Sequence, residues 1–184
     1  PNPFIGVNAW GPNLNIARDP RWGRASEVPS ECPFLAGKVG AAMVRGIQGD
    51  GEYVLTLAAL KHVTAYSLES WRDDTEGPRN GTAHSRFGFD ANISRHDLAE
   101  VYLEQFRIAI AEGVPLGMMC SYAAINGTAS CESGALLTTW ARSSQGFEGN
   151  VVTDGGALQM SSEPADLAES AAAALNAGVD LNCG

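Results

Sequence analysis

The sequence predicts an α/β fold in which parallel strands alternate with helices. Short apolar runs that are rich in β-branched residues, typical of buried strands, recur along the chain, and segments with helical spacing separate them. The strand-like runs are residues 5–9, 54–61, 116–121, 150–153 and 179–181. Strands that alternate with helices imply right-handed crossovers and a parallel sheet that helices cover.

Four segments between these runs have the spacing of amphipathic helices. They are residues 34–47, 95–113, 135–142 and 165–175. The second has the clearest signals, because the Ser94 hydroxyl can cap it, with Asp97 three residues on, and Gly113 can end it. Its apolar face is formed by Leu98, Tyr102, Phe106 and Ala109.

The order of elements favours a TIM-type barrel over a dinucleotide-binding fold. No Gly-x-Gly-x-x-Gly motif and no P-loop follows the early strands. A (β/α)8 barrel needs about 250 residues and eight strands, whereas this chain has 184 residues and about five strand-like runs. We therefore expect a partial (β/α)8 barrel, with residues 1–184 forming a fragment of a larger catalytic domain.

Composition limits the classes of partner. The hydrophobic content of 45% and charged content of 18% are ordinary for a globular domain. A net charge of -9 disfavours nucleic acids and anionic membrane surfaces, whose binding depends on Lys and Arg. No apolar run approaches the length that crosses a bilayer. Neutral or weakly polar ligands fit this composition better.

Cysteines and possible glycosylation sites favour a secreted protein. The chain has four cysteines, and Asn80, Asn92 and Asn126 each begin an N-x-Ser/Thr triplet. Disulfides and N-linked glycans both occur outside the cytosol.

Polar residues at three strand ends suggest one site. Asp154 follows the Val151–Val152 pair, and Lys61–His62 and Tyr122 follow other apolar runs. A barrel brings such positions to one mouth. Taken alone, Asp154 could cap a turn, Lys61 could be a surface lysine and His62 a core residue. Lys61 could also form a Schiff base in an aldolase-like barrel.

Two polar segments flank these strand ends. In "NLNIARDPRWGRASEVPSE" we interpret Arg18, Asp19 and Arg21 as a self-paired ionic loop and Arg24 as the better ligand candidate. The long polar connection 69–85 follows the strand that carries Lys61, so we expect it on the functional face.

Six blocks of the sequence, taken together, resemble glycoside hydrolase family 3, in its β-xylosidase-like branch. They are "NLNIARDPRWGRASE", "ALKHVTAYSLESW", "RFGFDANISRHDLAEVYLEQFRIAIAEG", "MMCSYAAINGTASC", "NVVTDGG" and "NAGVDLNCG". The resemblance implies the N-terminal (β/α)8 catalytic domain of a larger enzyme, with an α/β sandwich domain and often a fibronectin-like domain after it.

The resemblance also assigns roles to residues. It implies that Asp154 is the nucleophile that forms a covalent glycosyl-enzyme. The implied sugar-binding residues are Arg24, Lys61, His62, Tyr122 and Arg86. The nearby cations are expected to keep the Asp154 carboxylate ionised. The resemblance implies no metal and no cofactor, and its substrates are oligosaccharides or aryl glycosides.

The acid/base carboxyl group has no assignment in this chain. In this family it usually comes from the later domain, so Glu27, Glu76 and Glu132 are not given that role. Gly155 stands where relatives commonly carry Trp or Cys, which leaves the aglycone side and the choice among xyloside, arabinoside and glucoside open. Cys120 and Cys131 match a pair that xylosidase-like relatives often bridge, with two free thiols as the alternative.

The function that these residues favour is a retaining, exo-acting glycoside hydrolase that removes xylose, arabinose or glucose from non-reducing ends. An inactive or sugar-binding remnant of such a domain is the alternative, along with the aldolase-like barrel on Lys61.

Overall fold

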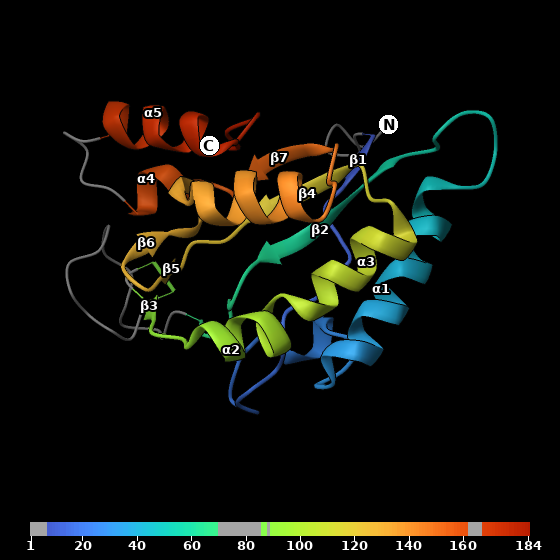
Figure 1. Ribbon diagram of the computed structural model, residues 1–184, viewed down its shortest axis with the longest axis horizontal. Helices are drawn as coiled ribbons and strands as arrows, with labels where there is room; N and C mark the ends of the chain where they lie inside the picture. Colours follow the sequence, from blue (N-terminus) through green and yellow to red (C-terminus); the bar gives the residue numbers. More distant parts are fainter. Residues whose placement is uncertain (1–6, 70–85, 88, 162–166) are drawn as a thin grey trace.

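The core of the protein is a four-stranded parallel sheet. A computed structural model describes residues 7–69, 86–87, 89–161 and 167–184. The strand order is β1-β2-β4-β7, and every neighbouring pair is parallel (Figure 1). The strands are β1 (Asn8–Ala9), β2 (Leu57–Val63), β4 (Gly117–Cys120) and β7 (Asn150–Thr153). The predicted fold class, a partial (β/α)8-type barrel with a parallel sheet, is confirmed.

Helices connect these strands, as the alternating pattern predicts. The longer ones are α1 (Pro33–Gln48), α3 (Glu104–Gly113), η4 (Ala135–Ser144) and α5 (Leu167–Ala177). The shorter ones are η1 (Ala25–Glu27), α2 (Arg95–Asp97), η2 (Leu98–Tyr102), η3 (Ser130–Glu132) and α4 (Ala157–Ser161). A small second sheet, which the sequence did not predict, has the order β3-β5-β6 and contains β3 (Asp90–Ala91), β5 (Ala124–Ile125) and β6 (Thr128–Ala129).

The helix expected over 95–113 is interrupted. Ser94 caps it as predicted, because its Oγ accepts a hydrogen bond from the backbone N–H of Asp97 at 3.0 Å. The chain then widens into the π-turn η2, in which the N–H of Leu103 bonds to the carbonyl of Leu98 at 2.9 Å. Such turns shift the phase of a helix, and Ser-Asp capping signals do not reveal them.

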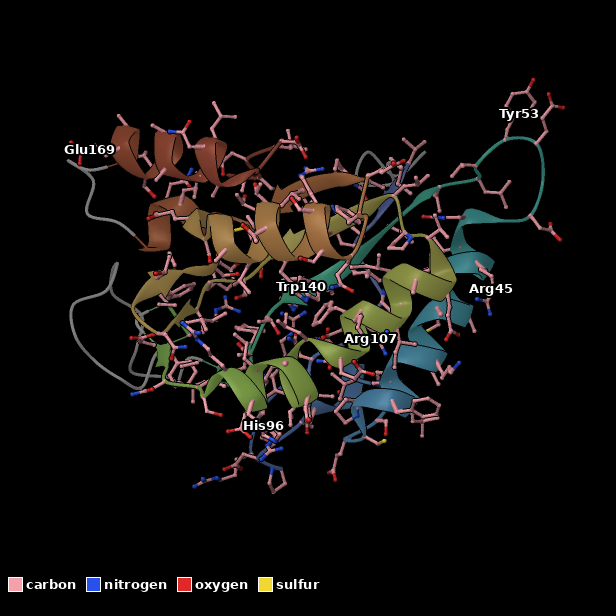
Figure 2. The ribbon with its side chains drawn as sticks, in the orientation of Figure 1. Arg45, Tyr53, His96, Arg107, Trp140 and Glu169 are labelled. Atoms are coloured by element: carbon pink, nitrogen blue, oxygen red, sulfur yellow. A yellow bond between two sulfur atoms is a disulfide. The ribbon has the colours of Figure 1, made fainter. Side chains whose placement is uncertain are left out.

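Helices α1 and α3 lie side by side, and glycines allow the close approach (Figure 1). A Cβ at Gly37 would lie 2.7 Å from Cβ of Ile108, and one at Gly113 would lie 3.0 Å from Cα of Ala41. Figure 2 labels Arg45 on α1, which donates to the carbonyl of Glu112 at 2.7 Å. Of this pair, α1 also packs against β2.

The sheet is buried on both faces where the site begins. The consecutive residues Ala58, Ala59 and Leu60 in β2 are fully buried, as in parallel strands with a cover on each side. By contrast, Tyr53 in the loop between α1 and β2 is 78% exposed and projects from the body (Figure 2). Over the described ranges, no helix has both the length and the apolar character needed to cross a bilayer.

Two predicted strands differ in extent. Strand β2 runs to Val63, so Lys61 and His62 lie inside it and not beyond its end. The expected strand over 179–181 makes one parallel bridge, between Leu181 and Val152. The backbone N–H of Leu181 donates to the carbonyl of Val151 at 3.1 Å, and the N–H of Thr153 donates to the carbonyl of Leu181 at 3.0 Å, so this segment pairs with β7 over a single bridge.

Candidate active site

Asp154 occupies the carboxyl end of β7, where the sheet edge opens. Its side chain is only 13% exposed. The backbone N–H of Gly155 donates to Oδ1 at 2.8 Å. Oδ2 lies 3.4 Å from Nε2 of His62, is buried, and has no hydrogen bond to the described residues. One oxygen of the carboxylate is therefore held by the backbone, and the other faces the residues of β2.

His62 is held as a neutral ring with its proton on Nδ1. The backbone N–H of His62 donates to Oδ1 of Asn15 at 2.9 Å, which fixes the orientation of that amide. Oδ1 can only accept, so Nδ1–H of His62 donates to it at 3.0 Å. Asn15 Nδ2 donates in turn to the carbonyl of His62 at 2.8 Å. Nε2 is left as an acceptor and points towards Asp154 and Arg24.

Burial and nearby cations keep His62 uncharged. Its side chain is 1% exposed. Burial lowers the pKa of His62 well below its ordinary value, and the charges of Arg24 and Lys61 lower it further. The 3.4 Å approach of His62 to Asp154 is thus not an ion pair.

Arg24 reaches the site from the loop before α1. Its Nη1 donates to Nε2 of His62 at 3.2 Å. Its Nε and Nη2 donate to the two oxygens of Glu27 at 2.6 and 2.8 Å, and Asn13 donates to Glu27 at 3.2 Å. These hydrogen bonds, that from Arg24 first, lower the pKa of Glu27 to about 2. A carboxyl group with this pKa is unsuited to act as a general acid near neutral pH.

The expected effect of the cations on the pKa of Asp154 is present, but burial opposes it. Burial raises the pKa of Asp154 above its ordinary value, and this cause is the largest. The hydrogen bond from Gly155 and the charges of Arg24 and Arg86 lower the pKa, but they do not offset burial. The sequence shows the cations, whereas the depth of the carboxylate depends on the assembled sheet.

Lys61 contributes positive charge from β2. It is half-buried, and burial lowers its pKa, as does the charge of Arg24. The charges of Glu27 and Asp154 act in the opposite direction. Lys61 thus belongs to the same charge cluster as Arg24, Glu27 and Asp154.

Tyr122 and Arg86 form the opposite wall. The Tyr122 hydroxyl donates to the carbonyl of Gly155 at 2.7 Å. The Arg86 guanidinium lies 4.8 Å from the centre of the Tyr122 ring, and Phe87 packs edge-on against the same ring at 5.0 Å. Burial, followed by the charge of Asp154, raises the pKa of Tyr122 to about 12.

Cys120 and Cys131 are joined by a disulfide across the Tyr122 loop. Cys120 ends β4, and Cys131 lies in η3. The bridge ties the start of the loop to its return. Of the remaining cysteines, Cys32 is free and exposed, and Cys183 is free and half-buried.

The structure brings all six residues expected at the site into one cluster around Asp154. The predicted ionic loop is present in part: Asp19 and Arg21 form an exposed pair at 2.5 Å, and Arg18 makes no ion pair with a described residue. Sequence reasoning missed Asn15, Asn13, Tyr66 and Glu69. The "NLN" triplet beside a strand was the available signal for the two asparagines, but their use became evident only when β2 was placed beside them.

Most of the 69–85 connection, the N-x-Ser/Thr triplets and Glu132 lie outside this cluster or outside the described residues. Most of the connection 69–85, with Glu76 and the Asn80 triplet, lies outside the described residues. Asn92 and Asn126 are exposed. The Asn126 amide bonds to both backbone groups of Ile93, at 2.8 and 2.9 Å. The Glu132 carboxylate accepts a hydrogen bond from the Ser170 hydroxyl at 2.5 Å and makes no hydrogen bond to the described residues of this cluster. In the described part of the chain, no group of three His, Cys, Asp or Glu side chains is arranged to hold a metal.

The chain is similar in sequence to known glycosidases. Residues 5–183 match the model of the glycosyl hydrolase family 3 N terminal domain. Probable beta-D-xylosidase 7 of Arabidopsis thaliana is 39% identical over 191 residues, which cover 97% of this chain and 24% of that relative. Exo-1,4-beta-xylosidase bxlB of Emericella nidulans is 41% identical over 187 residues, with 97% and 23% covered. The chain therefore spans less than a quarter of the length of these relatives.

Solved glycosidase structures also match nearly the whole of this chain over a small part of their own length. A GH3 exo-beta-xylosidase in complex with a xylobiose aziridine activity-based probe has a TM-score of 0.86 and 34% identity, over 97% of this chain and 23% of that one. Beta-glucosidase 3B from Thermotoga neapolitana in complex with glucose has a TM-score of 0.76 and 30% identity, over 94% and 20%.

Proposed function

Because this chain belongs to glycosyl hydrolase family 3, we propose that it carries the sugar-binding half of a retaining, exo-acting glycosidase site whose nucleophile is Asp154. The observation that carries the proposal is the position of its carboxylate at the end of β7, 3.4 Å from His62 and beside the wall of Tyr122 and Arg86. Charged and phenolic donors around one carboxylate suit a ring with several hydroxyls.

The proposed reaction has two displacements at the anomeric carbon. A carboxylate oxygen of Asp154 forms a bond to C1, and the bond from C1 to the leaving oxygen breaks while that oxygen takes a proton from a second carboxyl group. Water then attacks C1, gives up a proton to the same group, and releases Asp154. The Asp154 carboxylate must be ionised in the first step and is regenerated in the second.

The residues around Asp154 have distinct proposed roles. Arg24, Lys61 and Arg86 donate hydrogen bonds to sugar hydroxyls and counter the charge that burial makes costly. Neutral His62 takes no proton in the proposed reaction, because its Nε2 already accepts a hydrogen bond from Arg24. Tyr122 bonds to the carbonyl of Gly155 and so fixes the peptide that follows the nucleophile.

The acid/base group is proposed to come from a part of the protein outside this chain. Glu27 is bound by Arg24 on both oxygens, and Glu132 is occupied by Ser170. In a retaining enzyme the second carboxyl group stands about 5 to 5.5 Å from the nucleophile. The proposed substrate is a β-xyloside, an α-L-arabinofuranoside or a β-glucoside. We propose that the enzyme acts outside the cell. We do not favour the Lys61 Schiff base, since the chain belongs to a family of hydrolases.

The test is the stereochemistry of hydrolysis by the full-length protein. Proton NMR of the first-formed sugar from aryl β-xyloside, α-L-arabinofuranoside and β-glucoside should show the same anomer as the substrate. The Asp154→Asn variant should remain folded and lose turnover. An inverted product, no hydrolysis of any of the three, or retained turnover in Asp154→Asn contradicts the proposal.

A further inference from the structure

We infer that Glu69 is a positioning residue of this site, which holds Arg86 and Tyr66 in the orientation that faces the sugar at Asp154. The inference rests on the proposed function and deepens it. Glu69 makes no contact with Asp154 in the structure, so it acts through its two partners.

Glu69, Arg86 and Tyr66 form a closed triangle of hydrogen bonds. The Tyr66 hydroxyl donates to Oε1 of Glu69 at 2.7 Å. Nη1 of Arg86 donates to Oε2 of Glu69 at 3.2 Å and to the Tyr66 hydroxyl at 3.2 Å. Each oxygen of the carboxylate has its own donor. A neutral side chain of the same length could not accept from both donors, because one end of an amide is itself a donor.

The triangle leads to the nucleophile through Arg86. The guanidinium of Arg86 stacks over the ring of Tyr122 at 4.8 Å, and Tyr122 bonds to the carbonyl of Gly155. All of the hydrogen bonds that Arg86 makes to described residues come from Nη1, and its buried Nε has no partner there. Glu69 thus binds Nη1 of the Arg86 guanidinium.

The triangle also leads to the residues on the other side of the site. The Tyr66 ring lies 4.8 Å from the His62 ring and 5.6 Å from the guanidinium of Arg24. The stem of Glu69 lies against the segment that carries Arg24, since a Cβ at Gly23 would be 3.5 Å from Cγ of Glu69. Glu69 therefore lies between Arg86 and the segment that carries Arg24.

Electrostatics explains why a carboxylate is needed at this position. Arg24, Lys61 and Arg86 all act on His62 as positive charges. Three cations in a half-buried space repel one another. Without a negative partner, the long side chain of Arg86 is free to swing into solvent, and its stacking on Tyr122 would be lost. Glu69 provides that partner, with side-chain exposures of 29% for Arg86 and 24% for Glu69.

The test compares Glu69→Gln with wild type in the full-length protein on an aryl glycoside that wild type hydrolyses. We expect kcat/KM to fall at least about tenfold, because small displacements of a positioned group cost up to about a hundredfold. The matched control is Glu104→Gln, since Glu104 also binds an arginine, Arg107, through both oxygens, but does so on α3 (Figure 2). The control should stay within about twofold of wild type. A wild-type kcat/KM in Glu69→Gln overturns the inference.

A second background separates positioning from general stability. In Arg86→Met, Glu69→Gln should add less than about a twofold further loss, because contacting residues that act as a unit are non-additive. The same tenfold loss in both backgrounds overturns the route through Arg86. Should Glu69→Gln fold poorly, Glu69→Asp keeps the charge on a shorter stem, and it should retain more kcat/KM than Glu69→Ala.

A structural readout keeps this inference separate from the proposed function. In a crystal structure of the full-length Glu69→Gln variant, we expect the Arg86 guanidinium to leave the Tyr122 ring. An unchanged Arg86 contradicts the inference whether or not the protein hydrolyses glycosides. Wild type that hydrolyses none of the three aryl glycosides contradicts the proposed function, and the position of Arg86 still decides the role of Glu69.

Discussion

Asn15 binds His62 on three sides, through the backbone N–H, the ring Nδ1–H and the backbone carbonyl of the histidine. The side chain of Asn15 is almost fully buried, as is His62. The three bonds fix which ring nitrogen carries the proton, and so decide that Nε2 faces Asp154 as an acceptor. A residue 47 positions away in sequence thereby sets the chemistry beside the proposed nucleophile.

Replacing Asn15 by alanine should destabilise the protein and disturb this tautomer. The substitution leaves two buried N–H groups and a carbonyl of His62 without partners, and each such group costs about 1–3 kcal/mol. We expect the free energy of unfolding, measured with urea, to fall by at least about 1–3 kcal/mol. The control is Asn92→Ala at an exposed position, which should stay within about 0.5 kcal/mol. Equal stability of the two variants would contradict the role of Asn15.

The pH dependence of turnover should respond to Arg24. The charge of Arg24 lowers the pKa of Asp154, against the raising effect of burial. Removing that charge in Arg24→Met therefore raises the pKa of Asp154, and the carboxylate becomes ionised only at higher pH. The acidic limb of the kcat/KM profile should move to higher pH in this variant. The pH profiles of wild type and variant, measured on one substrate, check this. A shift of the acidic limb to lower pH would contradict the proposed effect of Arg24 on the pKa of Asp154.

The two glycines after Asp154 should differ in their tolerance of a side chain. Among the atoms of the described residues, a Cβ at Gly155 would meet only the Tyr122 hydroxyl, at 3.9 Å, whereas Gly156 has a φ of 68°. Gly155→Ala should therefore be neutral or raise stability by up to about 1 kcal/mol, and Gly156→Ala should lower it by about 1–2 kcal/mol.

Thermal unfolding of the two variants measures the difference, and Gly156→Ala serves as the matched partner of Gly155→Ala. If both lose the same stability, the space beside Gly155 is not open. The family resemblance associates the position of Gly155 with the aglycone side, so the two alanine variants should also be compared on aryl glycosides with small and bulky aglycones.

Much of the fold was predictable from the sequence because it depends on local signals. Ser94 and Asp97 identified the start of a helix, and the Val151–Val152 pair identified β7 and, with it, the position of Asp154. The small sheet that pairs Asp90 with Ala124 was not predictable, since it depends on contacts between distant segments. The π-turn at Leu98–Tyr102 is local, but capping signals do not reveal it.

The site was predictable in its residue types but not in its energetics. Lys61 and Tyr122 were predicted from their place near strand ends and from the family resemblance, and Arg24 from its polar segment and the same resemblance. The raised pKa of Asp154 was not predicted, because the burial that raises it is a property of the folded chain. Asn15 and Glu69 bind other side chains rather than a strand end, and no pattern in one sequence distinguishes such residues from ordinary polar ones.

Removing the disulfide should loosen the Tyr122 loop. The bond between Cys120 and Cys131 closes a short loop, and such a cross-link contributes about 2–4 kcal/mol by restricting the unfolded chain. The double variant Cys120→Ser/Cys131→Ser should lose stability in that range, and its kcat/KM should fall because the Tyr122 hydroxyl is less firmly held against Gly155. Urea unfolding and kinetics of the folded fraction check both effects. Cys32→Ser, at an exposed free thiol, is the control and should match wild type.

The most direct test of the central claim is covalent trapping of the nucleophile. The full-length protein, treated with an activated 2-fluoro-glycoside of the sugar that it hydrolyses fastest, is digested and analysed by mass spectrometry. The account predicts one fluoro-sugar on the peptide that contains Asp154, and none in Asp154→Asn. A label on a different carboxylate, or rapid turnover with no labelled peptide at all, would contradict it.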